Sequence, residues 1–365
     1  MGYEVDFLAV GDESKSGDAI ALRFGNLYGE RAEQAVIVID GGFKDDGRKL
    51  VEHIRTYYGT DIIDVVIATH PHGDHIAGLE TILKEMQVKE FWIHKPWDEN
   101  HTNNISKWFT DGRVTDNSVR EALRKSLDTA RELEKIATQK GIPIIEPFVG
   151  IYKDFGFGRI DIAGPTKDYY ESLLPDFAST PESRSSFATF LTGAVEKVTE
   201  VVSKVFESWD VETLDDNGET SAENTSGAIT LLRIDGKTLL FTGDAGISAL
   251  TNVADLLEAS GITNENYSFI QVPHHGSKRN VGPTILNRLI GPKLGEDKEI
   301  KTAFASCAKD GNPKHPAKKV TNAFKRRGAS VHATQGENKC EPKDAPVRQG
   351  WFKSIPLRFY DEVEE

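Results

Sequence analysis

The feature that most constrains this chain is a cluster of three histidines and one aspartate that directly follows an apolar run. The run Val65-Val66-Ile67-Ala68 is short and rich in β-branched residues, which predicts a buried strand. The next residues are Thr69-His70-Pro71-His72-Gly73-Asp74-His75, so the cluster lies on the loop where that strand ends. His70 and His72 can turn both rings toward one ion, and Asp74 and His75 can turn toward a second ion beside it. Neutral imidazole together with carboxylate suits Zn²⁺, with Mn²⁺ or Fe as alternatives, so the sequence predicts a metal site.

This His-x-His-x-Asp-His pattern resembles that of the metallo-β-lactamase superfamily, and two further motifs support the resemblance. In that superfamily an aspartate that ends an earlier strand steadies the metal ligands, and Asp40 follows the apolar run 36–39. The resemblance implies that Asp40 holds a ligand imidazole in one tautomer and orientation. A later Gly-Asp supplies a carboxylate between the two metals, and Gly243-Asp244 follows the run 238–242 in the same way.

Other landmarks are similar to the metallo-β-lactamase domain of bacterial DNA-internalisation competence proteins. They occur in that family's order between about residue 10 and residue 332. In that family the domain is attached to a membrane channel, whereas here we expect it to stand alone. The landmarks are Val10-Gly11, Gly17-Asp18-Ala19-Ile20, Ala163-Gly164-Pro165-Thr166, Asn224-Thr225-Ser226, Pro273-His274-His275-Gly276-Ser277, Ser306 through Lys309, and His315-Pro316.

The resemblance implies two adjacent metal sites. His70 and His72 belong to the first and Asp74 and His75 to the second, with Asp244 between them. We expect zinc in both.

Each site needs one more ligand. His275 is expected to complete the second site and His274 to face the substrate, although the sequence alone cannot separate these neighbours. The first metal usually has a third histidine from the middle of the chain, and the stretch 224–226 contains none. Either water completes that site or His94 turns into it.

The chemistry follows from two ions that share one bridging hydroxide, whose pKa they lower toward neutrality. That hydroxide can attack a phosphorus atom in line, and the leaving oxygen then needs a proton or a cation. We count Asp74, His274 and His315 as catalytic. His315 is expected to be either a metal ligand or a general acid that contacts phosphate.

The basic neighbourhood of the later motifs favours an anionic substrate. Ser277, Lys278 and Lys309 are expected to bind the phosphate. We therefore expect a phosphodiesterase or nuclease that acts on single-stranded DNA, RNA or a small cyclic nucleotide. Two alternatives are open: a lactonase or amide hydrolase with the same fold, and a binding or regulatory module with a degenerate site.

Composition agrees with a soluble enzyme. The 365 residues carry a net charge of −13, which disfavours loose wrapping of nucleic acid but allows a local basic groove. No apolar stretch is long enough to cross a bilayer, and the first residues lack a signal-peptide pattern, so no membrane partner is expected. Two cysteines are too few for a disulfide framework, and a cytoplasmic location is expected.

Strand and helix patterns predict an α/β fold in which two sheets pack face to face between helical layers, an αββα sandwich. Strands are expected at 7–10, 19–24, 35–40, 65–69, 91–93, 157–162, 228–234, 238–242, 269–272, 302–306 and 330–333, and helices at 48–58, 79–86 and 320–327.

One domain is expected over residues 1–340, with a C-terminal extension over 341–365. Two segments, about 97–142 and 167–222, have the pattern of helical insertions. A capping box at Ser118 is expected to open a helix that ends at Gly141, and an apolar stripe runs from Phe187 to Val205. These helices can cap the active site, form a homodimer surface, or pack against the sandwich.

Overall fold

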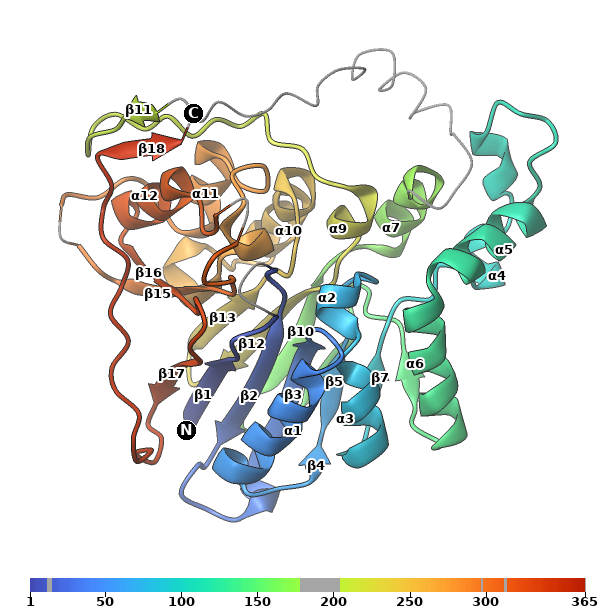
Figure 1. Cartoon of the computed structure of the whole chain (residues 1–365), viewed down its shortest axis with the longest axis horizontal. Helices are drawn as coiled ribbons and strands as arrows, with labels where there is room; N and C mark the ends of the chain where they lie inside the picture. The colour runs from blue at the N-terminus through green and yellow to red at the C-terminus, as the bar shows by residue number, and fades with distance from the viewer. Residues whose placement is uncertain (12–14, 178–203, 297, 312–313, 365) are drawn as a thin grey trace.

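A computed structural model describes residues 1–365 except 12–14, 178–203, 297, 312–313 and 365. Two seven-stranded sheets pack against each other (Figure 1). The first sheet has the order β17-β1-β2-β3-β5-β7-β8. Its strands are β1 (Gly2–Phe7), β2 (Ala19–Gly25), β3 (Gln34–Gly41), β5 (Val65–Ile67), β7 (Phe91–Trp92), β8 (Ile144–Ile145) and β17 (Lys339–Lys343).

The second sheet has the order β16-β15-β14-β13-β12-β10-β9. Its strands are β9 (Tyr152–Asp154), β10 (Arg159–Gly164), β12 (Ile229–Ile234), β13 (Lys237–Phe241), β14 (Tyr267–Gln271), β15 (Lys301–Ala305) and β16 (Ala329–Ala333). Two separate two-stranded sheets are formed by β4 (Ile62–Ile63) with β6 (Gln87–Val88) and by β11 (Lys204–Phe206) with β18 (Glu362–Glu364).

Side chains that alternate between the two faces of a strand explain how one sheet contacts both the other sheet and a layer of helices. In β3, Ala35, Ile37 and Ile39 point into the core between the two sheets, while Val36 and Val38 point to the helices outside the first sheet. Successive side chains of a strand leave opposite faces, so β3 can be buried on both. Phe7, Phe241, Phe269 and Phe304 fill the inter-sheet core.

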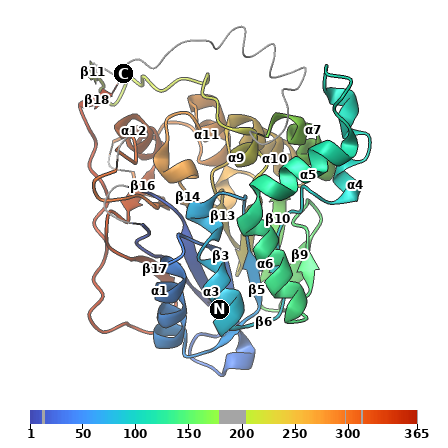
Figure 2. The ribbon, with the colours of Figure 1, turned by 45° about the vertical axis from the view of Figure 1, so that its right-hand side comes forward.

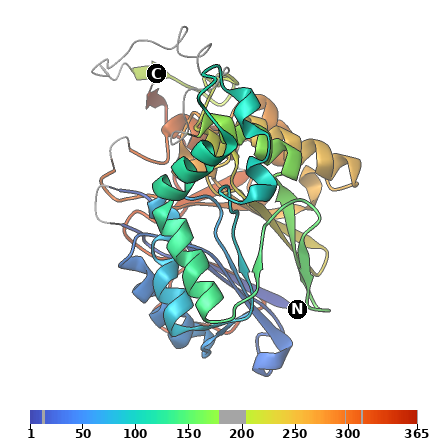
Figure 3. The same cartoon turned by 90° about the vertical axis from the view of Figure 1, so that its right-hand side faces the viewer.

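Helices cover both outer faces. In the side view of Figure 3, the teal-green helix α6 and the gold helix α10, both labelled in Figure 2, lie on opposite sides of the sheets. The helices over the first sheet are α1 (Asp46–His53), α3 (Leu79–Glu85) and α6 (Asp128–Gln139), and those over the second are α10 (Ile247–Ala259), α11 (Pro283–Leu289) and α12 (Lys318–Arg326). The predicted αββα fold is confirmed.

The remaining helical elements are short and lie in connections. They are η1 (Arg31–Glu33), η2 (Ile54–Tyr58), α2 (Gly73–Ile76), α4 (Glu99–Thr102), η3 (Ile105–Trp108), α5 (Asp116–Ser126), α7 (Lys167–Leu173), η4 (Leu174–Asp176), α9 (Ala222–Thr225), η5 (Asn264–Asn266) and η6 (Pro273–Gly276).

Two predictions about local structure were wrong in detail. The first strand covers Gly2–Phe7 instead of 7–10, because the charged Glu4 and Asp6 are buried on its outer face by partners far along the chain. The helix expected from Ser118 begins after Thr115, whose hydroxyl accepts from the Ser118 N–H, and it breaks at Leu127 into α5 and α6.

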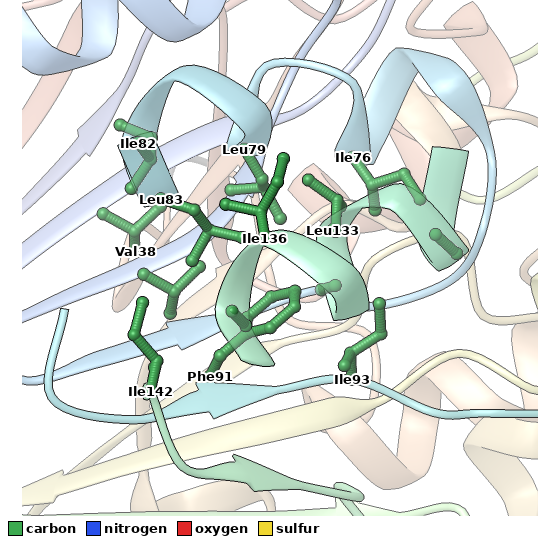
Figure 4. Packing of buried hydrophobic residues seen from close by; sticks show 14 of the residues in the cluster. Val38, Ile76, Leu79, Ile82, Leu83, Phe91, Ile93, Leu133, Ile136 and Ile142 are labelled. Carbon is green, nitrogen blue, oxygen red and sulfur yellow. The ribbon is translucent and has the colours of Figure 1, made fainter. Parts of the chain in front are cut away.

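Helix α6 lies within the first predicted insertion yet belongs to the helical layer. Leu133 and Ile136 pack against Leu79 and Leu83 of α3 and against Phe91 of β7 (Figure 4). Of the three roles expected for the inserted helices, α6 therefore has the third, packing against the sandwich. Most of the apolar stripe predicted between Phe187 and Val205 lies outside the described residues.

Candidate metal centre

The histidine cluster lies where several strands end at one edge of the sandwich. Strands β3 and β5 are parallel, as are β13, β14 and β15, so within each sheet their carboxyl ends share an edge. Asp40 ends β3, the histidine loop follows β5, Asp244 follows β13, and His274 and His275 follow β14. Because β2 is antiparallel to β3, Asp18 at its start reaches the same place.

Asp40 orients two of the imidazoles. Its carboxylate accepts from the Thr69 N–H at 2.8 Å and the Thr69 hydroxyl at 2.6 Å, and its Oδ2 lies 2.8 Å from His75 Nδ1. Since the Thr69 hydroxyl donates to Asp40, its oxygen can accept from His70 Nδ1, 3.0 Å away. Both rings thereby direct Nδ1–H at an acceptor, which makes Nε2 the atom that would bind a metal. Burial would lower the pKa of His75, but Asp244 and Asp40 raise it well above its usual range, so a metal would displace the proton on its Nε2.

Asp244 stands between two sets of imidazoles. Its Oδ1 lies 3.4 Å from His75 Nε2 and 3.9 Å from His275 Nε2. The Asp74 carboxylate approaches His275 Nε2 to 4.0 Å from the other side. Asp74, His75 and His275 supply atoms close enough together to share one ion, and Asp244 groups in the same way with His274 and His275.

The other Asp244 oxygen faces a second set. His274 Nε2 lies 3.3 Å from Asp244 Oδ2, and His70 Nε2 lies 3.8 Å from the same atom. His72 is the neighbour of His70, with its Nδ1 3.1 Å from His70 Nε2. His274 and His275 are presented to the two Asp244 oxygens by left-handed backbone conformations, with φ of 47° and 57°. Such angles are costly for side chains other than glycine and often mark functional sites.

The nitrogen and oxygen atoms of the centre are suited to bind cations. His75 Nε2, both ring nitrogens of His275 and Asp244 Oδ1 are buried without a hydrogen-bond partner. In the described part of the chain, the ion pairs of Asp18, Asp40, Asp74 and Asp244 are made with imidazoles and with no lysine or arginine. Buried carboxylates of this kind are costly unless cations balance them.

The electrostatics of the group agree with an excess of negative charge. Burial raises the pKa of Asp18 to about 7, and the carboxylates of Asp244 and Asp40 add to the rise while His75 opposes it. Burial would also raise the pKa of Asp244, but the imidazoles of His75, His275 and His274 hold it well below its usual range. Burial lowers the pKa of His70 well below its usual range, so its ring is neutral and able to ligate.

Comparison with known proteins finds a family match over part of the chain. Residues 24–153 match the family model described as the metallo-beta-lactamase superfamily, and this span contains Asp40 and the whole histidine loop. The chain carries a metallo-beta-lactamase superfamily domain. No curated protein matches the chain.

Solved structures with the same fold are distant. The metallo-beta-lactamase fold protein YhfI from Bacillus subtilis is 9% identical, with a TM-score of 0.43 over 94% of this chain and 100% of its own. A diphosphatase from the PhnP family is 10% identical, with a TM-score of 0.39 over 94% and 98%. CmlA, a diiron beta-hydroxylase from Streptomyces venezuelae, is 11% identical, with a TM-score of 0.42 over 93% of this chain and 54% of its own. At these scores the likenesses carry no argument about activity.

The predicted phosphate-binding residues lie in the connections that follow β14 and β15. Ser277 is buried just after η6, Lys278 is half-buried, and Lys309 is exposed. His315 is brought to the same loop because Gly276 packs on the next residue. A methyl group at Gly276 would lie 2.3 Å from Pro316 Cβ, and the φ of Gly276 is +91°. Burial, with His275 and His274, lowers the pKa of His315 to about 4.

His94 lies apart from the metal-binding atoms. Its ring stacks on Tyr170 at 4.4 Å and contacts Phe148 at 4.6 Å, and both its nitrogens are buried without partners. Burial lowers its pKa to about 3. A small cavity separates it from His70, and it joins none of the metal-binding clusters among the described residues.

Three polar residues of the centre were not predicted from the sequence. Asp18 lies behind His75 and His275, and Gln271 hydrogen-bonds to it. Asn280 accepts from His274 Nδ1 at 2.9 Å and donates to the Asp244 carbonyl at 2.8 Å. The Gly-Asp before β2 was a visible signal for Asp18, but nothing in the sequence distinguished Gln271 or Asn280. No helix in the described part of the chain is both long and apolar enough to span a membrane.

Proposed function

We propose that this metallo-beta-lactamase domain is a two-metal phosphodiesterase that acts on a nucleic acid or nucleotide. The observation that carries the proposal is that the two carboxylate oxygens of Asp244 face different histidines. Its Oδ2 faces His274 and its Oδ1 faces His75, so one carboxylate adjoins two imidazole sets. The residues on its two sides would hold two adjacent cations, which would suit the in-line displacement of a phosphodiester.

In this proposal His274 completes the first site in place of the missing mid-chain histidine. Asn280 Nδ2 donates to backbone carbonyls, so its Oδ1 faces the ring and accepts from His274 Nδ1–H. The Nε2 lone pair of His274 is then free on the side of Asp244 Oδ2. We therefore assign His274, His70, His72 and Asp244 to the first ion, and Asp74, His75, His275 and Asp244 to the second.

Two bound cations would supply a water of lowered pKa and neutralise charge on the phosphate. The chain's own residues would do the rest. Asp40 and Thr69 hold His70 and His75 in the ligating tautomer. Ser277, Lys278 and Lys309 would contact the phosphate at the rim, and His315 beside them would either donate a proton to the leaving oxygen or join the ligands.

The basic rim favours this reaction over a lactonase or amide hydrolase. Lys278 and Arg279 follow two residues after the His-His pair, where a neutral substrate would need an apolar surface. The order of motifs from Gly17-Asp18 to His315-Pro316, similar to that of competence-protein domains, further supports a nucleic acid substrate.

The test is hydrolysis of bis(p-nitrophenyl) phosphate, a short oligonucleotide and a lactone by protein loaded with zinc or manganese. We expect both diesters to be cleaved, Asp244→Asn to abolish cleavage, and Asp255→Asn, an exposed carboxylate on α10, to leave it unchanged. Cleavage of the lactone with neither diester cleaved would refute the proposal.

A further inference from the structure

Asp18 is a buried carboxylate that faces the Nδ1 atoms of His75 and His275. It is 1% exposed and directly precedes strand β2. Its Oδ2 lies 3.7 Å from His75 Nδ1, and its Oδ1 lies 3.9 Å from His275 Nδ1 and has no hydrogen-bond partner. The Nε2 atoms of both rings face Asp244 instead.

Asp18 lies close enough to His75 and Asp244 to share an ion with them, but its contacts with the two rings are on the Nδ1 side. His75 Nδ1 already has Asp40 as its partner at 2.8 Å, whereas His275 Nδ1 has none. Asp18 is therefore the carboxylate available to His275, as Asp40 is to His75. The gap of 3.9 Å is about 1 Å longer than a hydrogen bond, so a small shift of the ring toward an ion or of the carboxylate toward the ring is needed to close it.

Gln271 fixes the direction of Asp18. Its Oε1 accepts from the Thr242 N–H at 2.9 Å and the Gly243 N–H at 3.0 Å. Because backbone N–H groups can only donate, the amide oxygen must face them, and the amide nitrogen must face Asp18. Its Nε2 donates to Asp18 Oδ2 at 2.8 Å. This arrangement leaves Asp18 Oδ1 for His275.

We propose that Asp18 is a positioning residue of the second metal site, which accepts from His275 Nδ1–H and keeps the Nε2 lone pair directed at the ion, with Gln271 holding Asp18 in place. The inference rests on the proposed two-metal centre. Residues that orient a metal ligand in this way typically contribute 10–100-fold to metal affinity.

The amide of Gln271 makes a sharp test available. In Asp18→Asn, Gln271 Nε2 requires the new amide oxygen, so the new NH₂ group faces His275 and favours the wrong tautomer. Adding Gln271→Glu reverses the direction of the hydrogen bond between positions 271 and 18. The new carboxylate at position 271 accepts from the new NH₂ group at position 18, so the amide oxygen at position 18 faces His275. The double variant keeps the net charge of the wild type.

Metal binding is measured by competition with a chromophoric chelator for zinc, with histidine tautomers followed by ¹⁵N NMR of the zinc-loaded protein. We expect Asp18→Asn to weaken one of the two zinc sites by roughly 10–100-fold, and the double variant to recover most of the loss together with the Nδ1–H tautomer of His275. Thermal unfolding of the metal-free variants checks that they fold.

Three results would overturn the inference. One is unchanged affinity in Asp18→Asn, and another is a double variant no better than the single one. The third is complete loss of one zinc in both, which would make Asp18 a ligand. The wild type separates this inference from the proposed function, since failure of the wild type to bind two ions refutes the two-metal centre itself.

Discussion

His274 directs its Nε2 at Asp244 Oδ2 from 3.3 Å. The neighbouring His275 directs its Nε2 at the other oxygen, Oδ1, from 3.9 Å. Two adjacent residues thus face different oxygens of one carboxylate. In the proposed two-metal centre, this arrangement would supply the first site with an imidazole although the middle of the chain offers none.

The first prediction concerns His274. Because its ring is held by Asn280 with Nε2 toward Asp244, His274→Ala is expected to lower the metal content by about one ion per chain, the result of opening one of two sites. Elemental analysis after dialysis measures this content. His332→Asn, far from the centre and bonded to Ser354, is the control and should keep both ions. Full metal content in His274→Ala would contradict the ligand role and would favour a role for His274 in contacting the substrate.

The second prediction concerns His94. Since both its nitrogens are buried without partners, His94→Phe should leave the metal content unchanged and raise the free energy of unfolding by up to about 1 kcal/mol. His101 offers the matched contrast, because its two nitrogens bond to Glu171 and Glu146. His101→Phe should destabilise by about 1–3 kcal/mol. Loss of one ion in His94→Phe would show instead that His94 turns into the first site.

The third prediction concerns Arg348, which binds the C-terminal segment to β1. Its guanidinium donates to Asp6 at 2.7 and 2.8 Å and to Glu4 at 3.1 Å. Removing one partner of a buried ion pair is costly, so Arg348→Ala should lower the free energy of unfolding by about 3–5 kcal/mol at pH 7. The exposed Lys353→Ala should have little effect. Urea unfolding measures the free energy of unfolding of both variants. An Arg348→Ala variant as stable as the wild type would contradict the stabilising role of this ion pair.

The same network predicts a pH dependence. Burial would raise the pKa of Asp6, but hydrogen bonds from His53 and Arg348 hold it below its ordinary value. A carboxyl with a depressed folded-state pKa contributes stability that is full above its unfolded pKa, near 4, and is lost as the pH falls further. The difference between the wild type and Arg348→Ala should therefore shrink below about pH 4, and a constant difference down to pH 2 would exclude this cause.

The fourth prediction separates the two roles of His315. If it donates a proton to the leaving oxygen, His315→Ala should keep both ions and lose roughly 10²–10⁴-fold in rate on a diester with an alkoxide leaving group. The loss should be much smaller with p-nitrophenolate, which leaves without a proton. Equal losses on both substrates together with lower metal content would make His315 a ligand instead.

Local patterns predicted most of the strands because β-branched runs such as 65–68 are buried whatever lies elsewhere in the chain. They failed at β1, where Glu4 and Asp6 are buried by Arg23 and Arg348. The same limit applies to the centre. Asp18 and Gln271 meet across 253 residues, and no local spacing records that contact.

The sequence also left His274 and His275 equivalent. Their different directions follow from two consecutive left-handed residues, which no side-chain pattern announces. Asp40, in contrast, could be assigned from its position at a strand end, and the structure places its carboxylate on Thr69 and His75.

The most direct test of the two-metal account is an anomalous-difference map from crystals of the protein loaded with zinc, collected at the zinc edge. We predict two peaks on opposite sides of the Asp244 carboxylate. One should lie among Asp74, His75 and His275, and the other among His70, His72 and His274. A single peak, or two peaks of which neither touches Asp244, would contradict the account.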